Sequence, residues 1–122
     1  MVELGYKILN IIVWQKSDAR PTLSRNYFNF TTEYIVWARK HKHIPHYFNC
    51  NLMEMLNGGT RMSDVWKIPF VASWEMQCGA HPTQKPLRLL YRIILSTPRE
   101  GDTLLDPFAG RCTTGITANL LN

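Results

Sequence analysis

The chain has 122 residues, of which 45% are hydrophobic and 19% are charged, and its formal net charge is +5. This composition excludes an intrinsically disordered chain, and the length allows one small domain or part of a larger one. The basic excess favours an anionic partner such as nucleic acid, although a solvated basic surface explains it equally well. No apolar run is long enough for a membrane span, and the first residues lack the features of a signal peptide, so we expect no membrane partner.

The cysteines and histidines do not form a metal or redox motif. No two cysteines have the two-residue spacing of such motifs, which favours reduced thiols in a cytosolic protein; the cysteines are Cys50, Cys78 and Cys112. The histidines in and just after the basic run RKHKH, residues 39–43, lack cysteine or carboxylate companions at ligand spacing, which argues against a metal site; they are His41, His43 and His46.

The first half of the chain predicts two strands separated by a loop. Residues 4–16 end in the β-branched and aromatic run Ile11–Trp14, which predicts a buried strand preceded by the end of a helix. Residues 17–31 have the composition of a loop, and 32–38 predict a second strand. For the aromatic residues of the loop we favour burial in the core over stacking on a base; they are Tyr27, Phe28 and Phe30.

The middle of the chain predicts short elements. Residues 47–58 favour a short helix closed by Gly58, because glycine is the usual residue after a helix end. An extended segment within 61–70 ends at Pro69, and residues 71–80 are expected to be irregular.

The last third predicts helix, strand, glycine loop and helix. Pro86 opens a helix with apolar residues at helical spacing, which ends before Pro98 and Gly101. Residues 103–106 predict a short apolar strand, 107–112 a tight loop, and 113–121 a second helix. This succession is typical of an α/β fold.

The loop after Asp106 has the features of a ligand-binding turn. Ligands of open α/β sheets bind at the carboxyl ends of strands, where a loop enters a helix. Gly110 allows the backbone to bend, and the hydroxyl of Thr113 or Thr114 can cap the helix. The N–H groups at that helix start favour an anion such as a carboxylate, and Phe108 offers an apolar ring beside it. A structural turn explains the same pattern equally well.

Two segments in this order resemble a known family. HPTQKPLRLLYRII, from residue 81, followed by DPFAGRCTTG, from residue 106, is similar to the paired cofactor motifs of β-class bacterial DNA amino-methyltransferases. The resemblance implies S-adenosylmethionine as cofactor and a Rossmann-like α/β fold. It implies these cofactor-binding residues: His81, Thr83, Gln84, Lys85, Asp106, Phe108, Ala109, Gly110, Thr113 and Thr114. Lys85 is a plausible partner for the cofactor carboxylate by its charge, or else a solvated surface lysine.

The resemblance covers nearly the whole chain. LGYKILNIIVWQKS resembles the helix–strand segment that follows the catalytic strand of the family, and FTTEYIVWARK resembles the next strand pair. NGGTRMSDVWKIP resembles the short target-recognition stretch. We therefore expect one partial methyltransferase domain over 1–122, with part of the catalytic sheet in 1–40, a short target-recognition region in 41–80 and the cofactor motifs in 81–122. Double-stranded DNA is the expected partner, contacted by the basic residues Lys16, Arg20, Arg25, Arg39, Lys40, Lys42 and Arg61.

The chain also departs from the family pattern. Arg111 replaces a small polar residue and Cys112 replaces a glycine, which would strain the loop if position 112 needs a positive φ. The catalytic Asp-Pro-Pro-Tyr of the family is absent, since the one Asp-Pro, at 106–107, belongs to the cofactor loop. We therefore expect a fold that is incomplete at both ends and no catalytic residue in this chain.

The resemblance implies a type II restriction-modification enzyme that methylates an exocyclic amino group, adenine N6 in preference to cytosine N4. Three readings stay open for the chain itself. It is a segment that acts only with a missing N-terminal methyltransferase part, a non-catalytic remnant that binds DNA or cofactor, or a fragment without molecular function.

Overall fold

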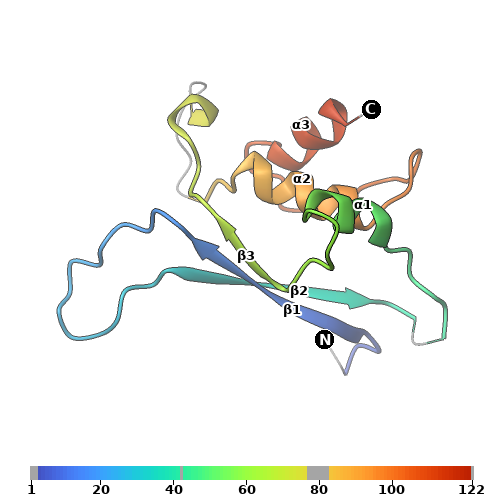
Figure 1. The fold of residues 1–122 in the computed structure, drawn as a ribbon, viewed down its shortest axis with the longest axis horizontal. Coiled ribbons are helices and arrows are strands. Elements are labelled where there is room, and N and C mark those ends of the chain that lie inside the picture. The colour runs from blue at the N-terminus through green and yellow to red at the C-terminus, as the bar shows by residue number, and fades with distance from the viewer. Residues whose placement is uncertain (1–2, 42, 77–82, 122) are drawn as a thin grey trace. The chain divides into compact units, whose positions relative to one another are not determined.

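The computed structural model describes residues 3–41, 43–76 and 83–121 (Figure 1). The chain folds into two compact units, which we name the sheet unit (Met1–His46 with Ser63–Pro69) and the helical unit (Tyr47–Met62 with Phe70–Asn122). The sheet unit contains the strands β1 (Lys7–Lys16), β2 (Thr32–Arg39) and β3 (Val65–Ile68). The helical unit contains the helices α1 (Cys50–Leu56), α2 (Leu87–Ser96) and α3 (Thr113–Leu120) and the 3-10 helix η1 (Ser73–Met76).

The three strands form one mixed sheet in the order β2–β1–β3. β1 is antiparallel to β2 and parallel to β3, and a register shift between Ile8 and Asn10 marks a bulge in β1. Side chains of successive residues point to opposite faces of a strand. Trp14 therefore shares a face with Trp66, its partner in β3.

One face of the sheet carries the core of this unit. Trp14, Trp66 and Ile68 are 1%, 6% and 0% exposed, and Ile12 is also buried. The indole Nε1 of Trp14 donates a hydrogen bond to the carbonyl of Ile68 at 2.9 Å, which fastens β1 to the end of β3. The buried indole thus satisfies its own donor and a backbone acceptor at once.

The opposite face of the sheet is also apolar, but it is exposed. It carries Ile11, Tyr34, Val36 and Val65, each of which is exposed, and Ile11 lies opposite Val36 in the register of β1 with β2. Strands that are apolar on both faces are typical of sheets covered on both sides.

The helical unit is organised around α2, against which α1 and α3 both pack. Leu89 and Ile94 of α2 are buried, as its apolar spacing predicted. The backbone N–H of Asn49, just before α1, donates to the carbonyl of Ser96 at the end of α2 at 2.9 Å. This bond ties the start of α1 to the end of α2. No helix among the residues that the structure describes is long and apolar enough to cross a membrane.

Most of the elements predicted from the sequence are confirmed, including the end of α1 before Gly58, whose φ is +70°. Three expectations were wrong. Among the described residues no helix precedes β1, where residues 3–5 form a turn, and η1 interrupts the segment 71–80 that was expected to be irregular. Residues 103–106 form no strand, because no described strand pairs with them; Leu105 is 87% exposed.

We predict that Trp14→Phe lowers the free energy of unfolding by about 1–3 kcal/mol, because the buried carbonyl of Ile68 loses its hydrogen-bond donor. Urea unfolding followed by circular dichroism measures this. Trp74→Phe is the control, since Trp74 is 62% exposed and its replacement should change the stability by less than about 0.5 kcal/mol. Equal effects of the two variants would contradict the role given to Trp14.

Candidate cofactor loop and basic surface

The carboxylate of Asp106 fixes the loop that precedes α3. Its Oδ1 accepts the backbone N–H of Phe108 at 3.0 Å, and its Oδ2 accepts the hydroxyl of Thr114 at 2.7 Å. The first bond closes the turn at Pro107, and the second joins that turn to the first turn of α3. One half-buried side chain therefore sets the position of the loop relative to the helix.

Two residues of this loop have left-handed backbone conformations. Gly110 has φ +52°, and Cys112 has φ 56° and ψ 26°. The nearest atom to a Cβ built on Gly110 would be the Phe108 carbonyl oxygen at 3.8 Å, an ordinary contact, so glycine is favoured there by its φ and not by space. Position 112 does have a positive φ, and a side chain other than glycine costs about 1–2 kcal/mol in that conformation.

The start of α3 is not capped in the way the sequence predicted. Cys112 is the N-cap residue, and its side chain makes no capping hydrogen bond. The hydroxyl of Thr114 bonds to Asp106 instead, and Thr113 is buried. The expectation that a threonine caps α3 was wrong. Thr113 is the first residue of the helix and lies one position after the N-cap residue, so its hydroxyl does not act as the cap. Phe108 is 92% exposed, and Ala109 and Gly110 are exposed beside it.

The segment before α2 carries the other predicted cofactor residues. Thr83 is exposed, Lys85 is half-buried, and Pro86 is buried as the N-cap of α2. The Nε2 of Gln84 donates to the carbonyl of Glu75 at 3.1 Å. His81 lies outside the described residues. The two predicted cofactor segments thus precede α2 and α3, which pack against each other in the same unit.

Glu75 binds the start of α2, a role that the sequence did not indicate. Its carboxylate accepts backbone N–H groups from both Ala72 and Leu87, at 3.3 and 2.8 Å. Leu87 is 12 residues further along the chain, so neither a capping box nor any other local spacing could have predicted the contact.

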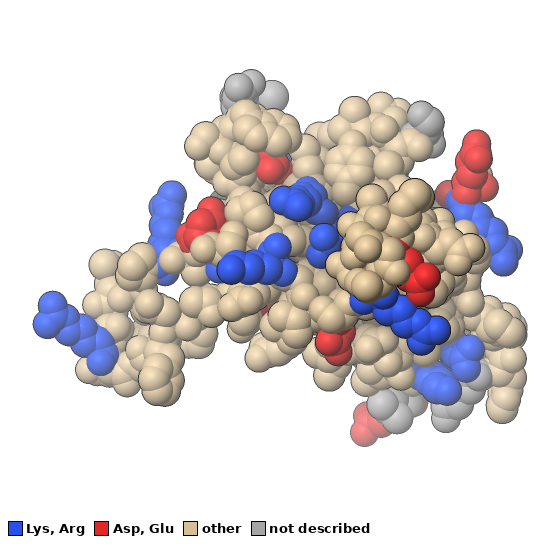
Figure 2. Space-filling view, in the orientation of Figure 1, with Lys and Arg blue, Asp and Glu red and all other residues tan. Residues whose placement is uncertain are grey.

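Within the sheet unit, the basic residues that were predicted to contact DNA differ in their surroundings. Lys16 forms an ion pair with Glu33 at 2.8 Å, and its side chain is 15% exposed. The Nη1 of Arg39 donates to the carbonyl of Ile44 at 3.0 Å. The exposed members of the set lie in or next to loops; they are Arg20, Arg25 and Lys40. Lys42 lies outside the described residues. Figure 2 shows basic side chains at several places on this face, with acidic side chains among them.

The aromatic side chains of the loop between β1 and β2 are exposed, which corrects the preference for a core role. Phe28 and Phe30 are 95% and 73% exposed, and Tyr27 is 54% exposed. Tyr27 and Phe30 contact each other with ring centroids 5.5 Å apart. These rings are therefore available at the surface of the sheet unit.

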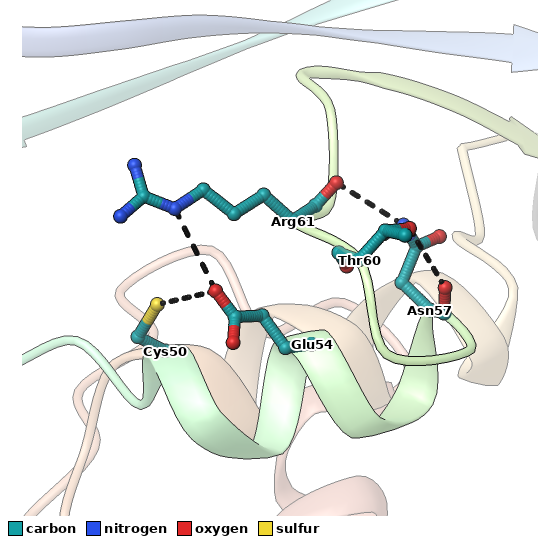
Figure 3. A network of polar contacts seen from close by, with 5 residues as sticks. All are labelled: Cys50, Glu54, Asn57, Thr60 and Arg61. Carbon is teal, nitrogen blue, oxygen red and sulfur yellow. Dashed lines mark hydrogen bonds and ion pairs between the residues drawn. The ribbon is translucent and has the colours of Figure 1, made fainter.

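Arg61 is the predicted DNA contact of the helical unit, and a polar network holds it (Figure 3). Its side chain is 89% exposed, with Nε 3.6 Å from the Oε1 of Glu54. The amide Nδ2 of Asn57 donates to the carbonyls of Thr60 and Arg61, each at 3.1 Å. The backbone that presents Arg61 is thus fixed by Asn57, while the guanidinium extends toward solvent.

The same carboxylate controls the thiol of Cys50. The Sγ of Cys50 donates to the Oε1 of Glu54 at 3.5 Å (Figure 3). This hydrogen bond, removal from water and the negative charge of Glu54 raise the pKa of Cys50, and the charge of Arg61 opposes them. Cys50 is therefore held as a neutral thiol. Within the described ranges, no three histidine, cysteine or acidic side chains lie together as a metal site would need.

We predict that Glu54→Ala increases the rate at which iodoacetamide alkylates Cys50 at mildly alkaline pH by at least about twofold, because a lower pKa raises the thiolate fraction. Peptide-resolved mass spectrometry separates Cys50 from the other cysteines. Arg61→Ala should act in the opposite direction, since it removes the charge that lowers the pKa. Unchanged rates in both variants would contradict the network.

Known proteins match this chain over nearly its whole length. The model of the family N6_N4_Mtase, described as DNA methylase, matches residues 1–122. The type II methyltransferase M2.MboI of Moraxella bovis is 54% identical over 120 residues, which cover 98% of this chain and 44% of that protein. M2.DpnII of Streptococcus pneumoniae is 52% identical over 118 residues, with 96% and 44% covered. The chain thus spans less than half the length of these relatives.

A solved structure has a similar fold. The crystal structure of the M1.HpyAVI-SAM complex superposes with a TM-score of 0.75 at 30% identity, and the match covers 98% of this chain and 54% of that one. M1.HpyAVI in another crystal structure gives 0.67 at 26% identity. These matches confirm the expected partial α/β methyltransferase fold. The chain belongs to the N6_N4_Mtase family of DNA methylases.

Proposed function

We propose that the chain is the cofactor-binding part of a site-specific DNA methyltransferase, with S-adenosylmethionine as methyl donor and an exocyclic amino group of DNA as acceptor. The observation that carries the proposal is the start of α3. The helix begins after a loop that Asp106 fixes, and its N-cap residue Cys112 provides no capping side chain. The N–H groups of that first turn can then bind an anionic group of a ligand.

The residues around this helix start fit the methionine end of the cofactor. When bound, S-adenosylmethionine supplies the methyl group on a sulfonium. The cofactor carboxylate is an anion, and the N–H groups of α3 or the ammonium of Lys85 would hold it. The exposed ring of Phe108 offers an apolar surface beside them. A relative of similar fold has been crystallised as a complex with SAM, which supports the same ligand here.

Asp106 acts on the loop in this proposal. Both of its carboxylate oxygens already accept hydrogen bonds, from Phe108 and from Thr114. Removing the carboxylate would release the turn from α3, and the ligand would then have to order the loop when it binds. The affinity would fall by that cost.

We propose adenine N6 as the methylated position and double-stranded DNA as the partner. The adenine assignment depends on the resemblance of the segments around the cofactor motifs to adenine-N6 enzymes. For DNA binding, the exposed guanidinium of Arg61 and the exposed basic residues of the sheet unit would contact phosphates or bases. Lys16 is the weakest candidate, because its ammonium is paired with Glu33 and largely buried. Such an enzyme would act in the bacterial cytoplasm.

Transfer of the methyl group needs residues that these 122 residues do not contain. Methylation of an exocyclic nitrogen requires a flipped base whose amino group is held against the methyl group. The sequence has one Asp-Pro, at 106–107, and the carboxylate of Asp106 already accepts hydrogen bonds from Phe108 and Thr114. We propose that the chain depends on a further methyltransferase segment for catalysis.

We predict that the 122-residue chain binds S-adenosylmethionine, and that Asp106→Ala weakens this binding by at least about tenfold, because two hydrogen bonds to a charged group are lost. Isothermal titration calorimetry measures the dissociation constants. With labelled cofactor and unmethylated DNA, the chain alone should transfer no methyl group.

Two variants serve as controls. Asp64→Ala removes an exposed carboxylate from the sheet unit and should leave the dissociation constant unchanged. Cys112→Gly should bind at least as tightly as the wild type, because glycine adopts the left-handed conformation of that position without cost. Absence of binding by both the wild type and Cys112→Gly would contradict the cofactor site, and robust methyl incorporation would contradict the dependence on another segment.

A further inference from the structure

Helix α2 begins without a capping side chain of its own. Its N-cap residue is Pro86, which has no side-chain oxygen and makes no capping bond. The N–H of Leu87, the first helical residue, needs an acceptor from outside the helix. The Oε2 of Glu75 provides it at 2.8 Å, across 12 residues of sequence. A remote carboxylate therefore does what an N-cap side chain does in other helices.

Glu75 also holds the residues just before the helix. Its backbone carbonyl accepts the amide Nε2 of Gln84 at 3.1 Å. The segment 84–87 is thus bound to one residue at both of its ends, through Gln84 and through Leu87. Lys85, the predicted partner of the cofactor carboxylate, lies between these two points of attachment.

Glu75 is itself held in place by a short turn. Its backbone N–H donates to the carbonyl of Ala72 at 3.0 Å, and its Oε1 accepts the N–H of Ala72 at 3.3 Å. The 3-10 helix η1 contains this turn, and the Glu75 side chain is half-buried. The bonds with Ala72 therefore orient the carboxylate that accepts the N–H of Leu87. Its negative charge lies at the start of α2, where the helix dipole favours it.

We propose that Glu75 is a positioning residue of the cofactor site, which sets the place of Lys85 by fixing the segment on either side of it. This inference rests on the proposed function, because it assigns the orientation of Lys85 to cofactor binding. Glu75 acts through the backbone of 84–87 and does not touch the ligand.

The test combines amide exchange with cofactor binding in the full chain. Glu75→Ala should speed hydrogen exchange of the Leu87 amide and weaken binding of S-adenosylmethionine about fivefold, the factor that corresponds to a typical lost helix cap. Glu75→Gln keeps the side-chain length and one acceptor oxygen, so its effects should lie between those of the wild type and Glu75→Ala. Circular dichroism checks that each variant is folded.

Asn49→Ala is the matched control, because Asn49 caps α1 in the same unit by accepting the N–H of Leu52 at 3.2 Å. It should leave cofactor binding within about twofold of the wild type while destabilising the protein to a similar extent. Equal weakening by Asn49→Ala and Glu75→Ala, or unchanged affinity in Glu75→Ala, would overturn the positioning role. Failure of the wild type and of Cys112→Gly to bind the cofactor would instead overturn the proposed function, and this inference with it.

Discussion

The backbone N–H groups at the start of a helix have no acceptor within the helix, and α1, α2 and α3 differ in whether a side chain supplies one. The Asn49 side chain caps α1 locally, and Glu75 caps α2 from a distant turn. At α3 the N-cap residue Cys112 makes no such bond, and Asp106 fixes the preceding loop instead. The start of α3 is therefore ordered but not filled by its own N-cap side chain, which is the property that a site for an anionic ligand requires.

The sequence was sufficient where the signal is local. The β-branched runs of β1 and β2 and the apolar spacing of α2 predicted those elements, because period-two and helical patterns depend on near neighbours. The strand expected at 103–106 needed a neighbouring strand, and the described residues contain none beside it. Glu75 could not be found either, since its acceptor role depends on a contact 12 residues away. Sequence patterns do not fix a helix start to the exact residue. Because α3 begins at Thr113, no threonine occupies its N-cap position, and the Thr114 hydroxyl donates to Asp106 instead.

One face of the sheet exposes several apolar residues. Ile11, Val36 and Val65 lie on a face that a monomeric soluble protein would not ordinarily leave to water. The relatives are more than twice as long as the stretch that matches this chain, so each contains residues outside that stretch. Strands that are apolar on both faces are typical of α/β folds, in which both faces of the sheet are covered.

We propose that the segment before α2 and the loop before α3 form one cofactor site. A titration of the isotopically labelled chain with S-adenosylmethionine, followed by amide chemical shifts in NMR spectra, tests it most directly. We expect the largest shifts at the amides of Thr83, Gln84, Lys85 and Leu87 and of residues 108–114, with little change in β1 and β2. Shifts confined to the sheet unit, or shifts in only one of the two segments, would contradict it.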